Sequence, residues 1–344
     1  MTGYVGFETV APVSLYCPFD VVYHTEHERV SQYCISWASN AGLIRGMRAR
    51  SRFEASRIGE FVSLVYPRSN FQDTRLLCQF MIWLFMFDDQ FDEGDLGRHP
   101  EKMRTLFGRI LSAMEGGRAP ESPIEYSLRE FWASAGAIMP REWQDRFLRN
   151  FRDYLNAYTW EANNRVSGTI PGLKSYVDHR TLAGGIHMAF DLIEISRRIR
   201  ISSEIFEDPK FRRIRYSAAN VVCWHNDLFS FKKELASGDV HNLVVVIKNR
   251  DRCSLQQAWN RAANMVNEEV RKFVELEKLL PKFSDSIDFQ VQAYIDDLRN
   301  WMRGHLSWTS SSGRFEIVER EVRTQMPIYL EDILTVPSPR GGVV

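Results

Sequence analysis

The sequence predicts an all-α protein built as one large domain. Apolar residues recur at three- and four-residue spacing along most of the 344 residues, and alternating β-branched runs are scarce. The best strand candidate, the run LVVVI at 243–247, is short. No internal repeat, low-complexity segment or shift in composition marks a domain boundary. Although this length would allow two domains, the pattern favours a single α-helical bundle.

The expected elements follow one another between helix breakers. Residues 1–20 contain Pro12 and Pro18, and we expect them to form an extended N-terminal arm. Helical periodicity marks the following stretches: 73–91, 101–114, 140–164, 181–198, 211–236, 254–279 and 285–307. Breaker-rich segments interrupt it at 94–100, 116–120, 167–172 and 309–313. We therefore expect the helical domain to cover residues 21–336 and a flexible tail to cover 337–344.

The charge balance and the cysteine pattern exclude several classes of protein. The chain has 44 Lys and Arg residues in total and 44 Asp and Glu residues in total. It therefore lacks the basic excess that would bind nucleic acid or an anionic membrane. The longest strongly apolar run, 80–87, is far shorter than the roughly 20 residues of a membrane-spanning helix. The N-terminus shows no secretory signal. Five scattered cysteines without a C-x-x-C pair predict reduced thiols in a cytoplasmic protein.

An acidic cluster follows directly after the apolar run at 80–87. In a helix, Asp88 and Asp92 lie one turn apart on one face, and Asp89 and Glu93 lie beside them. Like charges at this spacing repel each other, and the helix C-terminus also disfavours anions, so a cation is expected to neutralise them. Mg²⁺ commonly takes one or two carboxylates together with substrate phosphates. The alternative is a charged helix end that faces water.

A second group of oxygen-bearing side chains lies in the sequence HNDLFSFKKE. Asn226, Ser230 and Glu234 recur at four-residue intervals and therefore share one helix face. Their amide, hydroxyl and carboxylate oxygens are ligands suited to Mg²⁺. Lys233 can contact a phosphate as a point charge. The alternative is an ordinary polar helix face.

Together the two motifs resemble the metal-binding pair of class I terpene synthases of the microbial type. The pattern N-D-x-x-S-x-x-K-E begins at Asn226, 138 residues after the aspartate-rich motif begins at Asp88. The resemblance implies a class I terpenoid synthase-like helical bundle in which the two motifs face each other across a central apolar cavity. It also implies three Mg²⁺ ions around the diphosphate of an isoprenoid substrate, with Mn²⁺ as a substitute.

The resemblance extends to the region between the motifs. The family has a diphosphate-sensing arginine about 46 residues before the asparagine, and Arg180 occupies this position. A linker residue and a small effector residue follow at a helix break, where this chain has Ala183 and Gly184, with Gly185 next. The linker is often acidic or hydroxylated in the family, so Ala183 departs from the pattern. The resemblance implies that Arg180, Ala183 and Gly184 act in the ionisation of the substrate.

The C-terminal part supplies the last match. The family has a tryptophan followed by Arg-Tyr, and this chain has Trp308 followed by Arg314 and Phe315. The arginine is kept, but the tyrosine hydroxyl is absent. We expect Arg180, Lys233 and Arg314 to bind the diphosphate.

Aromatic residues make up 12% of the chain, and a carbocation is stabilised by aromatic faces. By motif phase, Phe61, Phe85 and Trp308 are the candidates for contacting the substrate, and the alternative for each is ordinary core packing. His187 and His225 are expected to be histidines whose hydrogen bonds are satisfied within the core or around the site.

The resemblance implies an enzyme that releases diphosphate from a linear prenyl diphosphate and cyclises the resulting carbocation. We expect farnesyl diphosphate as the substrate and a sesquiterpene hydrocarbon or alcohol as the product. The alternatives are a diterpene synthase that uses geranylgeranyl diphosphate, a chain-elongating prenyltransferase and a non-catalytic helical module. An elongating enzyme would need a second aspartate-rich motif in place of Asn226, Ser230 and Glu234. The expected partner is this small molecule, with no nucleic acid and no membrane span, and the expected state is a monomer or a homodimer.

Overall fold

The computed structural model describes residues 10–92, 96–282, 284–315 and 332–334. In these segments the chain forms α-helices and two short 3₁₀ helices, with no strand, which confirms the all-α prediction. The first helices are α1 (His27–Asn40), α2 (Met47–Ser56), α3 (Ile58–Val65), α4 (Phe71–Asp92), α5 (Pro100–Met114), α6 (Pro123–Ile138) and α7 (Arg141–Ser167). The later ones are α8 (Leu173–Ala183), α9 (Ile186–Asp191), α10 (Ile193–Arg197), α11 (Ser203–Glu207), α12 (Pro209–Ser237), α13 (Leu243–Asp251), α14 (Leu255–Lys278) and α15 (Asp285–Thr309). The 3₁₀ helices are η1 (Leu96–Arg98) and η2 (Gly313–Phe315).

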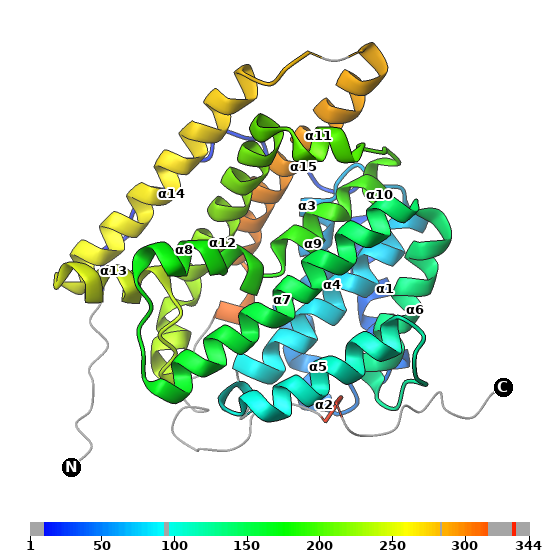
Figure 1. The fold of residues 1–344 in the computed structure, drawn as a ribbon, viewed down its shortest axis with the longest axis horizontal. Coiled ribbons are helices and arrows are strands. Elements are labelled where there is room, and N and C mark those ends of the chain that lie inside the picture. The colour runs from blue at the N-terminus through cyan, green and yellow to red at the C-terminus, as the bar shows by residue number, and fades with distance from the viewer. Residues whose placement is uncertain (1–9, 93–95, 283, 316–331, 335–344) are drawn as a thin grey trace.

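The long helices form a bundle, and the short, buried helix α3 lies on one side of it among three of them. Helix α3 packs against α1, α4 and α15, and all of its residues except Glu60 are buried. Helix α12 packs against α14, α15 and α8, while α7 crosses the front of the bundle in Figure 1. Both α4 and α12 therefore lie within the bundle, and these are the helices that carry the two sequence motifs.

Side-chain caps fix where several of these helices begin. Asp208 accepts hydrogen bonds from the backbone N–H groups at the start of α12, and Asn242 does the same for α13. Ser254 and Gln257 form a reciprocal capping box at the start of α14. Because Asn242 starts a helix immediately before the apolar run at 243–247, this best strand candidate is part of α13.

The expected helical stretch 181–198 consists of separate shorter helices. Helix α8 ends at Ala183, and Gly185 adopts the left-handed region with φ +63° before α9 begins. The chain then passes from α9 to α10 at Leu192, and Arg198 ends α10 with φ +53°. The family resemblance had implied the break after Ala183, whereas nothing in the sequence pattern indicated the break at Leu192.

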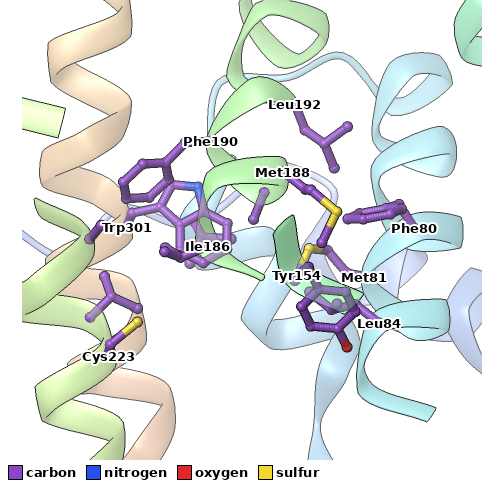
Figure 2. Packing of buried hydrophobic residues seen from close by; sticks show 14 of the residues in the cluster. Phe80, Met81, Leu84, Tyr154, Ile186, Met188, Phe190, Leu192, Cys223 and Trp301 are labelled. Atoms are coloured by element: carbon purple, nitrogen blue, oxygen red, sulfur yellow. The ribbon is translucent and has the colours of Figure 1, made fainter. Parts of the chain in front are cut away.

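The core is rich in aromatic rings from α4 and the helices around it. Trp83 and Phe87 of α4 stack with ring centroids 4.7 Å apart, and the indole N–H of Trp83 donates to the carbonyl oxygen of Ile124 at 2.9 Å. Figure 2 shows Phe80, Met81 and Leu84 on one side of α9, with Trp301 and Cys223 on the other. The aromatic excess is thus largely in the interior of the bundle.

The N-terminal arm lies along α14 in its described part. The side chain of Gln256 accepts from the backbone N–H of Ala11 at 2.6 Å, and that of Asn267 accepts from Tyr16 at 2.6 Å. The side chain of Asn267 also donates to the carbonyl oxygen of Ser14 at 3.0 Å.

The domain limits at 20 and 336 stay predictions, and the tail 337–344 lies outside the described residues. In the segments that the structure does describe, no helix has the length and apolar character needed to cross a membrane.

Candidate active site

Asp88, near the C-terminal end of α4, is held from two sides. The hydroxyl of Tyr158 on α7 donates to Oδ1, and Nη2 of Arg314 donates to Oδ2 at 3.0 Å. Burial raises the pKa of Asp88, while Arg314, Tyr158 and Lys233 oppose that rise. Arg314 contacts Asp88 of α4, and the next residue, Phe315, contacts Phe229 of α12 with ring centroids 6.3 Å apart, so these parts of α4 and α12 lie near each other. Asp92 is the last residue of α4 and its side chain lies outside the described set, so its role stays a prediction.

Arg314 also contacts Asp89, which the prediction did not assign to the site. Its Nη1 lies 2.6 Å from Oδ1 of Asp89, a carboxylate only 4% exposed. The guanidinium carbon lies 4.9 Å from the centre of the Phe85 ring, which completes a cation–π contact. A single arginine after α15 therefore joins two carboxylates and one aromatic face of α4.

The second motif lies on one face of α12, as predicted from its spacing. The amide oxygen of Asn226 accepts from Nη2 of Arg180 at 2.9 Å, and the hydroxyl of Ser230 donates to the carbonyl oxygen of Asn226 at 2.8 Å. One carboxylate oxygen of Glu234 accepts from the side chain of Asn242 at 2.8 Å. Burial and the nearby Asp227 carboxylate together raise the pKa of Glu234 to about 7, although Arg180 opposes the rise.

Arg180 is oriented by Asp227, a buried residue that the sequence did not single out. Nε of Arg180 donates to one carboxylate oxygen of Asp227 at 2.7 Å. The other oxygen accepts from the Tyr176 hydroxyl at 2.5 Å and from the backbone N–H of Leu243 at 3.1 Å. Burial alone would lower the pKa of Arg180, but Asp227 keeps it well above its ordinary value. The arginine therefore stays charged, with two of its nitrogens committed to Asp227 and Asn226.

The helix break at Ala183 and Gly184 lies beside Arg180. A Cβ atom on Gly184 would come within 3.1 Å of the Cys223 sulfur and 3.2 Å of Nη1 of Arg180. Ala183 is buried at the C-terminus of α8 and offers no polar side-chain atom. Gly184 thus leaves room for the arginine and for α12 to lie close together.

The three predicted aromatic residues form one cluster. The centroid of Phe61 lies 5.4 Å from that of Phe85 and 4.6 Å from that of Trp308, and Phe85 lies 5.5 Å from Trp308. The indole N–H of Trp308 donates to the carbonyl oxygen of Ser56 at 2.9 Å, which fixes the ring. Phe315, where the family has tyrosine, packs against Trp308 at 5.4 Å. Their contact with a substrate stays a prediction.

The donor chemistry of the two motifs fits a hard divalent cation. Asn226, Ser230 and Glu234 bring an amide, a hydroxyl and a carboxylate oxygen to one face of α12, and Asp88 brings a carboxylate from α4. Among the described residues, no group of three or more His, Cys, Asp or Glu side chains is placed to hold a metal.

Sequence reasoning missed the residues that support the predicted ones. Tyr158, Tyr176, Asp227 and Asn242 come from α7, α8, α12 and the turn before α13. Only Asp227 could have been found from the sequence, because it directly follows the motif residue Asn226. The others touch the site through contacts between helices, which sequence spacing does not report.

Comparison with known proteins identifies the class. The family described as "Terpene synthase family 2, C-terminal metal binding" matches residues 79–272. A (+)-T-muurolol synthase ((2E,6E)-farnesyl diphosphate cyclizing) from Roseiflexus castenholzii is 30% identical, over 87% of this chain and 92% of the relative. A germacrene A synthase from Nostoc punctiforme is 28% identical, over 89% of this chain and 95% of the relative. The crystal structure of germacradien-4-ol synthase from Streptomyces citricolor matches with a TM-score of 0.76 and 25% identity, over 88% of this chain and 99% of that one.

The chain belongs to the metal-binding terpene synthase family, and its single-domain helical fold is the class I terpenoid synthase fold. It is accordingly a terpene synthase, a lyase that acts on a prenyl diphosphate. The recognition of the two motifs in the sequence is confirmed at the level of family, fold and enzyme class.

Proposed function

We propose that the protein is a Mg²⁺-dependent sesquiterpene synthase that releases diphosphate from farnesyl diphosphate and cyclises the cation. The observation that carries this proposal is the pairing of Arg314 with Asp88 and of Arg180 with Asn226. Each pair joins a cationic side chain suited to a diphosphate with an oxygen ligand suited to a metal. The farnesyl substrate is supported by the printed activity of the Roseiflexus castenholzii relative.

The proposed metal ligands are the side chains of the two motifs: Asp88, Asp92, Asn226, Ser230 and Glu234. Bound there, three Mg²⁺ ions, or Mn²⁺ in their place, would stabilise negative charge on the leaving diphosphate as Lewis acids. Arg180, Lys233 and Arg314 would add charge-assisted hydrogen bonds to the same group.

The apolar end of the substrate is proposed to contact Phe61, Phe85 and Trp308. These rings already lie against one another, so they form a face that excludes water and tolerates a carbocation. Ala183 and Gly184 are proposed to act at the helix break beside Arg180, where a small residue lets the arginine reach the diphosphate.

The test is turnover of the purified protein with C10, C15 and C20 prenyl diphosphates and Mg²⁺, followed by gas chromatography–mass spectrometry and a diphosphate assay. We expect cyclised C15 products, their loss on chelation of the metal, and loss of turnover in Asp88→Ala and Asn226→Ala. Asp285→Ala, an exposed aspartate of α15, is the matched control and should keep activity. Full activity of both motif variants would contradict the metal assignment, and exclusive turnover of the C20 substrate would contradict the substrate.

A further inference from the structure

Two buried histidines face each other between α12 and α15. His225 is 0% exposed and His305 is 4% exposed, and their rings lie nearly parallel, at 7°, with centroids 6.2 Å apart. No hydrogen bond joins the two rings, because neither ring nitrogen of His225 has a hydrogen-bond partner among the described residues.

The pair differs from the other buried histidines of the described chain. Both ring nitrogens of His225 and Nδ1 of His305 have no hydrogen-bond partner among the described residues. By contrast, His24 contacts Thr74 at 3.2 Å and His187 contacts Thr181 at 3.0 Å. His187 thus has a hydrogen-bond partner, as expected, whereas His225 has none among the described residues.

Three unpartnered nitrogens at one place indicate a missing polar partner. Leaving a buried donor or acceptor unsatisfied costs about 1–3 kcal/mol per group. Buried water molecules commonly satisfy such groups when two or more polar partners surround them. Two nitrogens that share one water would lie roughly 4.5–5.5 Å apart, and rings with centroids 6.2 Å apart can place their nitrogens at that separation.

The pair lies next to the proposed substrate face. His305 is four residues after Trp301 and three before Trp308, so the three side chains share one face of α15. The Phe61 ring contacts all of them, at 5.4 Å from Trp301, 6.2 Å from His305 and 4.6 Å from Trp308. His225 directly precedes the motif residue Asn226. Water bound here would therefore lie at the edge of the aromatic cluster.

We propose that His225 and His305 together bind one water molecule, and that this water is the nucleophile that ends the cyclisation, so that the enzyme forms a terpene alcohol. The inference rests on the proposed function and assigns its final step. One N–H of His225 donates to the water, and the water donates to Nδ1 of His305.

In the final step, a lone pair of the water oxygen forms the C–O bond to the cationic carbon. One O–H bond of the resulting oxonium then breaks, its electrons remain on oxygen, and the proton passes to Nδ1 of His305. Without this water the cation would lose a proton from carbon and give a hydrocarbon.

The experiment compares product mixtures in water labelled with oxygen-18. Wild-type protein should give an alcohol that carries the label. In His305→Phe and His225→Phe, which keep a planar ring without nitrogen, the alcohol fraction of total product should fall at least about fivefold. His305→Gln keeps a polar side chain and should retain most of the alcohol. His24→Gln changes a buried histidine that contacts Thr74 outside both motifs, so its alcohol fraction should equal that of wild type.

A crystal structure gives a readout that does not depend on turnover. An ordered water within hydrogen-bonding distance of both rings is expected, and its absence would overturn the inference. Turnover that yields only hydrocarbons in wild type, or an unchanged alcohol fraction in His225→Phe and His305→Phe, would also overturn it while leaving the proposed function intact. Absence of diphosphate release from wild type would overturn the proposed function itself. If a thermal melt shows that His305→Phe is not folded, the alcohol fractions of His225→Phe and His305→Gln decide whether the inference holds.

Discussion

Arg314 and Asp88 lie 226 residues apart in the sequence and are joined by an ion pair, with Nη2 3.0 Å from Oδ2. The arginine expected to bind the diphosphate is thus bound to a carboxylate expected to bind a metal. A guanidinium that turns toward a diphosphate must release some of these N–H groups, so substrate binding would exchange an internal ion pair for an external one.

The first prediction concerns the fork geometry of Arg314. Its two terminal nitrogens reach Asp88 and Asp89 separately, which a lysine ammonium cannot reproduce. Arg314→Lys should therefore lower kcat/KM for farnesyl diphosphate by about 10- to 100-fold, the effect of losing a charged hydrogen bond. Steady-state assays of diphosphate release would measure it. Arg141→Lys, at an exposed position of α7, is the control, and equal losses in both variants would contradict the assignment.

The second prediction concerns the support of Arg180. Asp227 accepts from Arg180, Tyr176 and the backbone of Leu243. Asp227→Asn keeps the shape but removes the charge, so at least one of these donors loses its partner. We expect a loss of about 1–3 kcal/mol in the free energy of unfolding, measured in urea, together with a lower kcat. Tyr176→Phe removes one donor only and should have a smaller effect. A stable and fully active Asp227→Asn protein would show that Arg180 needs no such support.

The third prediction separates two adjacent glycines. Gly184 has an ordinary helical backbone, so Gly184→Ala costs little backbone strain but crowds Cys223 and Arg180. It should change the product ratio or kcat/KM while the melting temperature changes little. Gly185 has φ +63° and leaves only 3.0 Å between an added Cβ and Leu84, so Gly185→Ala should destabilise the fold by about 1–3 kcal/mol. Thermal melts and product analysis of the two variants would check this, and the reverse pattern would contradict it.

The fourth prediction concerns pH. Burial raises the pKa of Asp297 on α15 to about 7, while Arg197 at 3.7 Å opposes the rise. Because this carboxyl binds its proton more tightly when folded, its contribution to stability is complete below the unfolded pKa and is lost as pH rises through 7. Asn stays neutral, so Asp297→Asn should gain roughly 2–3 kcal/mol on wild type between about pH 5 and pH 8. Urea unfolding at both pH values measures this gain. A difference between Asp297→Asn and wild type that is the same at both pH values would contradict the prediction.

The sequence predicted what depends on spacing along a helix. A helix with 3.6 residues per turn places Asn226, Ser230 and Glu234 on one face of α12. The same periodicity places Asp88 on α4. The helix break after Ala183 was also predictable, since two glycines follow it. These features require no knowledge of how the helices pack.

Contacts between helices were beyond the same reasoning. Nothing in the spacing of Tyr158 indicates that its hydroxyl reaches Asp88, because the approach of α7 to α4 depends on the packing of the whole bundle. In the sequence Asp89 is marked only as a neighbour of Asp88, yet in the structure it contacts Arg314 at least as closely. The run at 243–247 has high strand propensity, but the Asn242 cap and the packing of α13 on α14 make it helical.

The burial of α3 has a consequence for how the protein is made. Helix α15 approaches α3 so closely that a Cβ on Gly304 would lie 2.8 Å from the Leu64 carbonyl oxygen. Helix α3 ends at Val65, whereas α15 begins at Asp285. At ribosomal rates this interval takes roughly 10–45 s. Helices α1 and α4 are available to pack on α3 early in translation, but the face of α3 that α15 covers in the folded protein stays open until that helix has been synthesised.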